Sequence, residues 1–177
     1  MTIDDQLRLH ARWSLALDAG QRARVAADLA WQTLHPAVRV FRLPGIYGPG
    51  RSALDRVLAG NAHRIDAPGH LFSRIHVDDI VQAVVASFNR GAPGVYNIAD
   101  RLPATGNAVT EFACDLLRRP YPPIEPLDTP RLSPMARGFY AENRRIAATK
   151  MVRDLGVRLR YADYMQGLRG CLKDMDR

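Results

Sequence analysis

The spacing of apolar and polar residues in the first third of the chain predicts two helices and a strand. Helical periodicity predicts a helix over residues 4–19, which stops at Gly20, and a second helix over 21–34. Residues 37–43 are typical of a strand, because valine and phenylalanine favour pleated structure. A turn-rich stretch follows over 44–50.

The middle of the chain contains the clearest amphipathic pattern. A short helix is predicted over 52–59, and residues 62–76 indicate a short two-stranded element with a turn at Pro68-Gly69. The next helix is predicted from Val77 to about Asn89, with acidic residues in its first turn, where they suit the helix dipole. Its apolar stripe consists of Ile80, Val81, Val84, Val85 and Phe88.

The last third continues the alternation of strands and helices. A strand is predicted over 95–99, and an irregular, proline-rich stretch runs from 120 to 134. Helices are predicted over 107–118, 133–140, 147–155 and 162–174. Strands that alternate with helices indicate an α/β fold.

Composition narrows the class of protein. The chain has 177 residues, 47% of them hydrophobic, which suits one domain with a sizeable core. Its two cysteines form no CxxC pair, which excludes a disulfide-rich secreted scaffold and a cysteine-based zinc finger. No run of 18 apolar residues and no clean signal peptide occurs, so we expect a cytoplasmic protein without a membrane span.

The net charge of +7 at first indicates nucleic-acid binding. However, the basic residues are spread along the sequence, with only short doublets such as Arg118-Arg119 and Arg144-Arg145. A nucleic-acid face usually carries a denser basic stripe, often with aromatic residues between the charges. We therefore interpret the excess as a solvated, arginine-rich surface and expect no nucleic-acid partner.

The segment from Gly45 to Gly50 lies between a predicted strand and a predicted helix, where a phosphate-binding loop would lie. Its spacing is G-x-x-G-x-G rather than the dinucleotide pattern G-x-G-x-x-G, and Pro49 removes one backbone N–H. The segment therefore does not predict a phosphate cradle. Because ligands collect at the carboxyl ends of strands in α/β sheets, Pro44 and the two residues after it remain candidates for ligand contact.

Three segments that occur in order carry a family resemblance: residues 42–50 (RLPGIYGPG), 72–80 (FSRIHVDDI) and 94–98 (GVYNI). The chain resembles the C-terminal half of the extended short-chain dehydrogenases, the NAD(P)-dependent epimerase/dehydratase family, over about residues 21–175. It is most similar to their atypical bacterial members with reduced or lost catalytic motifs. The segment 133–143 fits that branch too.

The resemblance implies a partial Rossmann-like α/β fold, made of its last strands and helices, with the small C-terminal substrate lobe of this family. The strand over 37–43 would be the sixth of the Rossmann sheet, so we divide the chain into a helical segment 1–36 and a remainder 37–177. Carried over by position, three residues would flank the nicotinamide of NAD or NADP: Pro44, Gly45 and Ile46. Four others would face the cleft between the lobes and bind a small-molecule substrate: Arg51, His76, Tyr140 and Asn143.

Simpler interpretations of these residues remain open. His76 also suits a structural hydrogen-bonding role at a strand end, and Tyr140 and Asn143 suit packing at a helix end. The histidines near Asp66, Asp78 and Asp79 lack H-x-x-x-H spacing and a cysteine partner, so we predict no metal site.

The sequence departs from the family in ways that affect function. It shows no dinucleotide glycine fingerprint, and the positions of the family's Y-x-x-x-K pair hold Gly20 and Arg24. We therefore predict no catalytic residue, and a chain that lacks the N-terminal dinucleotide-binding half and is inactive alone. A sixth Rossmann strand without its neighbours exposes a sheet edge, which the N-terminal helices, a second copy or a complementing chain would cover. The alternative function is a dimerising assembly module without catalysis.

Overall fold

The structure is a computed structural model that describes residues 19–140 and 145–175. The predicted helix over 4–19 therefore lies outside the described residues, apart from its last position. The chain divides into two compact units, residues 1–40 with 92–95 and residues 41–91 with 96–177. Each unit is described by itself, and the predicted division after residue 36 stays a prediction.

The first unit contains helix α2 (Ala19–Leu34), which confirms the helix predicted over 21–34. The predicted stop at Gly20 is wrong, because α2 includes this residue. A glycine inside a helix costs only about 1 kcal/mol relative to alanine, which the surrounding helix-forming sequence can offset. Strand β1 (Arg39–Arg42) follows and pairs with β5 (Gly94–Asn97) in a two-stranded sheet.

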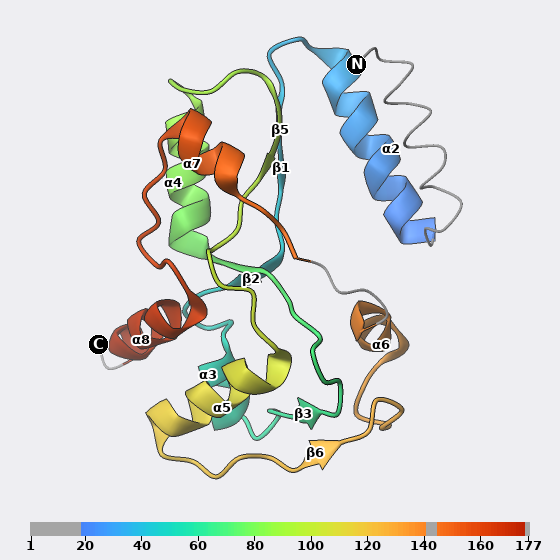
Figure 1. Ribbon diagram of the computed structural model, residues 1–177, viewed down its shortest axis with the longest axis vertical. Coiled ribbons are helices and arrows are strands. Elements are labelled where there is room, and N and C mark those ends of the chain that lie inside the picture. Colours follow the sequence, from blue (N-terminus) through green and yellow to red (C-terminus); the bar gives the residue numbers. More distant parts are fainter. Residues whose placement is uncertain (1–18, 141–144, 176–177) are drawn as a thin grey trace. The chain divides into compact units, whose positions relative to one another are not determined.

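In the second unit, β2 (Gly45–Tyr47) pairs in parallel with β4 (Arg74–His76). Gly45 lies opposite Arg74, and Tyr47 lies opposite His76. Strand β2 is labelled in Figure 1. The segment predicted as turn-rich thus contains a short strand. The sequence pattern did not indicate this strand, because its partner lies almost thirty residues later in the chain and a local turn pattern carries no information about that contact.

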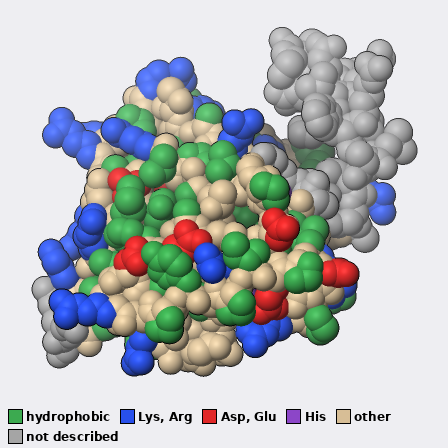
Figure 2. Space-filling view, turned by 60° about the horizontal axis from the view of Figure 1, so that its bottom comes forward, with side chains coloured by type: hydrophobic (Ala, Val, Ile, Leu, Met, Phe, Trp, Pro, Cys, Tyr) green, Lys and Arg blue, Asp and Glu red, His purple; other side chains and the backbone are tan. Residues whose placement is uncertain are grey.

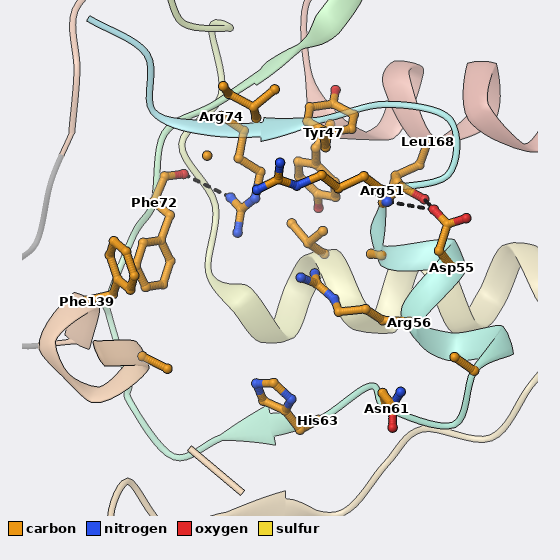
Figure 3. A pocket seen from close by; sticks show the side chains of 18 of the residues that line it. Tyr47, Arg51, Asp55, Arg56, Asn61, His63, Phe72, Arg74, Phe139 and Leu168 are labelled. Carbon is orange, nitrogen blue, oxygen red and sulfur yellow. Dashed lines mark hydrogen bonds between the residues drawn. The ribbon is translucent and has the colours of Figure 1, made fainter. Parts of the chain in front are cut away.

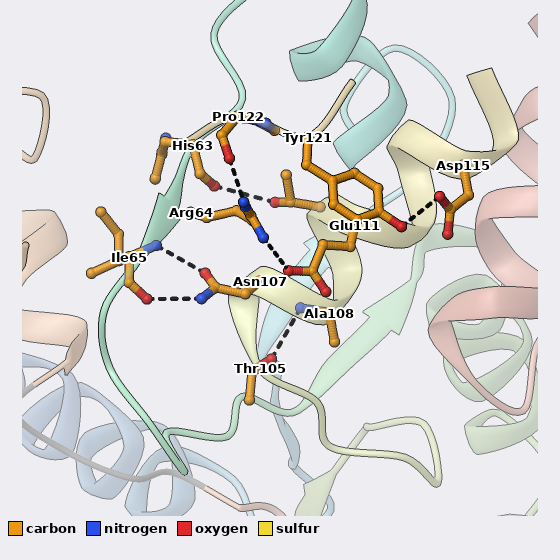
Figure 4. A network of polar contacts seen from close by, with 11 residues as sticks. His63, Arg64, Ile65, Thr105, Asn107, Ala108, Glu111, Asp115, Tyr121 and Pro122 are labelled. Atoms are coloured by element: carbon orange, nitrogen blue, oxygen red, sulfur yellow. Dashed lines mark hydrogen bonds and ion pairs between the residues drawn. The ribbon is translucent and has the colours of Figure 1, made fainter. Parts of the chain in front are cut away.

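Strand β3 (Arg64–Ile65) pairs in parallel with β6 (Ile124–Glu125). The predicted pairing within 62–76 is therefore wrong, since β3 and β4 both form but have other partners. The side chain of Asn107 explains the outcome: its Oδ1 accepts from the Ile65 amide and its Nδ2 donates to the Ile65 carbonyl, both at 2.9 Å (Figure 4). Because Arg64 also pairs with Glu111 at 2.8 Å, β3 is held against helix α5 (Gly106–Leu117) rather than against β4.

Helix α3 (Ala53–Leu58) starts at a capping box and packs on α5 (Gly106–Leu117). Ser52 is the N-cap of this helix, because its Oγ accepts from the Leu54 amide at 3.2 Å. The carboxylate of Asp55 in turn accepts from the Ser52 amide at 2.6 Å. Both helices and α8 (Tyr164–Met175) contribute to one hydrophobic core cluster, with Leu54, Val109 and Leu168 among its buried residues.

A second core cluster joins α4 (Val77–Ser87) to α7 (Thr149–Leu155). Ile75, Tyr96 and Met151 are fully buried in it. The stripe predicted on the helix after His76 is only partly buried, since Val81 and Val85 are each 56% exposed and Phe88 is 76% exposed. Smaller side chains on the opposite face, such as Ala83, allow close packing there and turn the larger ones outward.

The described chain is thus a mixed α/β structure with parallel strands, completed by the short helix α6 (Pro134–Tyr140). Within residues 19–140 and 145–175, no helix has the length and apolar character that crossing a bilayer requires. On the face shown in Figure 2, lysine and arginine side chains lie mostly near the outline, and acidic side chains lie among hydrophobic ones.

Candidate functional site

A cavity of about 760 Å³ opens in the second unit. Its walls come from β2, the following loop, α3, the segment leading into β4, α6 and α8 (Figure 3). These elements are far apart in sequence, and the parallel pairing of β2 with β4 brings their first residues together. The cavity is large enough for a small organic substrate.

Of the residues expected near a nicotinamide, Gly45 and Ile46 line this cavity. Pro44 is not among its lining residues. The Gly45 amide donates to the Ser73 carbonyl at 3.3 Å, which fixes the start of β2 beside the entry to β4. Ile46 is 38% exposed, so an apolar surface is available to a ligand at this point.

Three guanidinium groups extend toward the same part of the cavity (Figure 3). Arg51 comes from the loop after β2, where its amide and carbonyl bond the carbonyl and amide of Gly48. Arg56 comes from α3, and Arg74 from β4. No carboxylate within the described residues forms an ion pair with any of the three guanidiniums.

Arg74 is held by hydrogen bonds to backbone carbonyl groups rather than by an ion pair. Its Nη1 donates to the carbonyls of Phe72 and Ala104, each at 2.9 Å. Burial lowers the pKa of Arg74, the Asp100 carboxylate acts in the opposite direction, and the nearby Arg56 lowers the pKa further. Burial likewise lowers the pKa of Arg56. Both shifts have the same physical meaning: the site stabilises these cations less well than water does.

An aromatic wall stands beside these cations. The rings of Phe72 and Tyr140 meet edge to face with centroids 5.5 Å apart, and His70 contacts both of them. Burial raises the pKa of the Tyr140 phenol, while Arg56 and Arg74 act in the opposite direction. Tyr140 therefore presents a protonated hydroxyl, which is a hydrogen-bond donor, beside the two guanidiniums.

Tyr47 and Asp100 carry buried polar atoms without partners in the described part of the chain, namely the Tyr47 hydroxyl oxygen and Asp100 Oδ2. Burial raises the pKa of Asp100 to about 7, against the effect of its hydrogen bond from the Leu102 amide. Burial also raises the pKa of Tyr47, and Asp100 adds to that shift. Tyr47 lines the cavity, whereas Asp100 is not among the lining residues.

The structure brings together two of the four residues expected in the cleft, Arg51 and Tyr140. His76 lies elsewhere: it is 1% exposed, its Nδ1 accepts from the Asp78 amide at the start of α4, and its Nε2 lies 3.6 Å from Cys171 Sγ. Asn143 lies outside the described residues. Within the described ranges, no group of histidine, cysteine and acidic side chains could hold a metal ion.

Sequence reasoning missed Arg56 and Arg74 as cavity residues. Arg74 left a usable signal, because an arginine inside a strand with apolar neighbours requires a buried partner or a ligand. Arg56 left none, since an arginine on a short helix is usually a solvated surface residue.

Comparison with solved structures identifies proteins of similar fold. The chain is similar to a functionally unknown conserved protein from Silicibacter pomeroyi, with TM-score 0.83 and 43% identity over 89% of this chain and 57% of that one. It is also similar to UDP-glucose 4-epimerase from Thermotoga maritima, solved with UDP-glucose, with TM-score 0.57, 19% identity and coverage of 78% and 47%. For dTDP-glucose 4,6-dehydratase from Bacillus anthracis, solved with NAD, the values are 0.62, 22%, 85% and 49%.

The chain therefore spans about half the length of the solved structures that it matches. No protein-family model matches it, and no curated protein does. The expected resemblance is confirmed: the chain is structurally similar to the NAD(P)-dependent epimerase/dehydratase family, and it matches part of their Rossmann-like structures.

Proposed function

We propose that the chain forms the substrate side of an NAD(P)-dependent epimerase/dehydratase-like site, and that its cavity takes an anionic small molecule. In this proposal, β1 and β5 are the last Rossmann strands, and α3, α5, β3 and β6 belong to the substrate lobe. The observation that carries the proposal is the set of three guanidiniums, Arg51, Arg56 and Arg74, that extend into one cavity and form no ion pair with a described carboxylate.

Electrostatics supports an anionic ligand. Several cations held close together repel one another, and burial adds a desolvation cost, so a bound phosphate or carboxylate would stabilise the arrangement. Arg74 is oriented by the Phe72 and Ala104 carbonyls, which leaves Arg56 and the Tyr140 hydroxyl as the more adaptable donors. The UDP-glucose of the Thermotoga epimerase is a diphosphate of this general kind.

The cofactor side does not fit a complete dinucleotide. The glycine-containing segment 45–50 lacks the spacing of a phosphate cradle, and it leads into the N-terminus of α3. At that N-terminus Ser52 already accepts from the Leu54 amide, and the Asp55 carboxylate accepts from the Ser52 amide and would repel a phosphate. We propose that this chain alone does not bind NAD or NADP and has no oxidoreductase activity, and that Pro44, Gly45 and Ile46 meet a nicotinamide only when another polypeptide segment supplies the dinucleotide site.

The test is calorimetric titration at low salt with UDP-glucose and with inorganic pyrophosphate, with uridine as the uncharged control. We expect both anions to bind and uridine not to bind. Arg56→Gln should weaken anion binding about tenfold or more, as for a lost charge-assisted hydrogen bond. Arg153→Gln is the matched control, because Arg153 is exposed and paired with Asp154. Equal affinity of the wild type and Arg56→Gln for these anions would contradict the proposed anion site.

The cofactor proposal is tested separately, by titrating NADH and NADPH into the isolated chain. Micromolar binding of either one would overturn it, whatever the outcome for UDP-glucose.

The dimerising module remains a second candidate, because β1 and β5 form a sheet of only two strands in the described chain. Strand edges of this kind can pair with a second copy or a complementing chain. Light scattering at tens of micromolar distinguishes the two candidates: a clean monomer that binds UDP-glucose would favour the substrate site alone.

A further inference from the structure

Helix α4 presents an apolar stripe to solvent. Its four members recur at helical spacing on one face: Val77, Val81, Val85 and Phe88. Their exposed fractions are 40%, 56%, 56% and 76%. The opposite face of α4 packs in the second core cluster, where Ala83 is fully buried. The helix is thus held firmly by one face and leaves the other available, and none of the stripe residues lines the arginine-rich cavity.

Two hollows lie along one side of this stripe. The larger, of about 730 Å³, runs between α4 and α7 and is lined by Val85 and Val152 among others. The smaller, of about 490 Å³, is lined by Asp78, Val81, Gln82 and Arg160. Hollows beside an apolar helix face can receive the side chains of a docked segment, which a flat surface cannot do.

The same side of the stripe is basic. Arg90 and Arg158 line the larger hollow, and within the described ranges neither forms an ion pair. Arg160 lines the smaller hollow and pairs with Asp78 at 3.1 Å. A third hollow shares Arg160 with the second, and its lining includes Arg169, Lys173 and Asp174. Basic side chains therefore outnumber acidic ones on this side of the stripe.

We propose that the α4 stripe is a docking site for an amphipathic helix of a partner protein that carries acidic residues along one edge. At about 1.5 Å per residue, the distance from Val77 to Phe88 is roughly 16 Å, which three turns of a partner helix would cover. Its apolar side chains contact the valines and Phe88, and its carboxylates face Arg90 and Arg158. This site is independent of the proposed substrate site.

Charge argues against the other occupants. Two copies of this chain that paired antiparallel through α4 would place their arginine edges side by side, and like charges destabilise such a contact. A lipid surface would contact the stripe but would leave the hollows unfilled, whereas helix side chains fit them. A protein helix with an acidic edge satisfies both features.

The probe is a fluorescent helical peptide of fourteen residues with leucines on one face and glutamates along one edge, compared with a twin that has lysine at every glutamate. We expect the acidic peptide to bind with a Kd on the order of 10 µM, about tenfold or more tighter than its twin, and to weaken with salt. Val85→Asp should reduce binding about tenfold. Leu58→Asp should not, since Leu58 is 55% exposed on another helix.

The double variant R90E/R158E gives the sharpest readout, because it should reverse the preference toward the lysine peptide while leaving the apolar stripe intact. Equal binding of the two peptides would overturn the proposal. Self-association in sedimentation that Val85→Asp abolishes would overturn it in favour of a second copy. Binding to phosphatidylglycerol vesicles, but not to either peptide, would overturn it in favour of a lipid surface.

Discussion

Asp79 at the start of α4 accepts a hydrogen bond from the Arg160 amide, with Oδ1 2.6 Å from the nitrogen. Its second oxygen accepts from the Tyr161 amide at 3.1 Å. Asp79 is fully buried, and the two partners belong to the segment that connects α7 to α8. One carboxylate therefore fixes the path of the chain into the last helix.

Replacement of Asp79 by alanine should destabilise the second unit strongly. The two amides would lose a charged acceptor in a buried place, at a cost of about 2–4 kcal/mol. Asp79→Asn should cost less, because it keeps one acceptor oxygen. Urea unfolding measures the difference, and Asp154→Ala, at an exposed pair with Arg153, should leave the unfolding midpoint nearly unchanged. A midpoint for Asp79→Ala equal to that of the wild type would contradict the role of Asp79.

Asp100 should make stability depend on pH between about 4 and 7. Because burial raises the pKa of Asp100 to about 7, the folded protein keeps this proton while the unfolded chain releases it near the ordinary pKa of 3.8. The unfolded state then binds fewer protons, so stability falls as pH rises through this window, by at most about 1.4 kcal/mol per pH unit, and levels off above it.

The matched variant for this prediction is Asp100→Asn, which cannot titrate and keeps an acceptor for the Leu102 amide. Urea unfolding at pH 5 and pH 8 should show the free energy of unfolding falling more steeply with pH in the wild type than in the variant. Parallel pH dependences in the two proteins would show that Asp100 is ionised normally in the folded state.

Replacement of two helical glycines by alanine should change the stability of the protein in opposite directions. A methyl group at Gly167 on α8 would overlap the Tyr47 ring and hydroxyl, whereas one at Gly138 on α6 would meet no atom within 4 Å. Gly167→Ala should therefore destabilise the protein by about 1–3 kcal/mol, through overpacking. Gly138→Ala should stabilise it slightly, since alanine is the better helix former by about 1 kcal/mol. Thermal unfolding of both variants checks the signs, and a Gly167→Ala protein as stable as the wild type would mean that Tyr47 can move aside.

Both cysteines should be unreactive in the folded protein. Cys114 and Cys171 are fully buried, and burial raises the pKa of both thiols, that of Cys171 to about 11. Because the thiolate is the reactive form, a thiol reagent such as DTNB should react slowly with the native protein and rapidly in urea. A fast phase in native buffer would show that α8 or α5 opens readily.

Local signals in the sequence were sufficient to predict where several helices begin and end. The Ser52 cap and the stop at Gly60 were predictable, and Gly60 has the positive φ of 69° that such a helix end uses. The acidic first turn of α4 was equally clear, since Asp78 and Asp79 both lie in it. These features depend on contacts within a few residues, which a sequence displays directly.

The strand pairings were not predictable in the same way. The four strands of the second unit's two sheets have only two or three residues each, too few for an alternating pattern to specify a partner. For the candidate site, the family resemblance indicated Arg51 and Tyr140, and the structure places both in the lining of one cavity. The resemblance could not indicate Arg56, because the place of this residue in the cavity depends on which distant segments pack around it.

The pairing of β3 with β6 also governs how the molecule can assemble. These strands are separated by β4, α4, β5 and α5, so their contact closes a loop of about sixty residues and has an entropic cost that local contacts do not have. We expect the intervening helices to form earlier, since their contacts are local, and the pairing of β3 with β6 to be among the later contacts made as the chain folds.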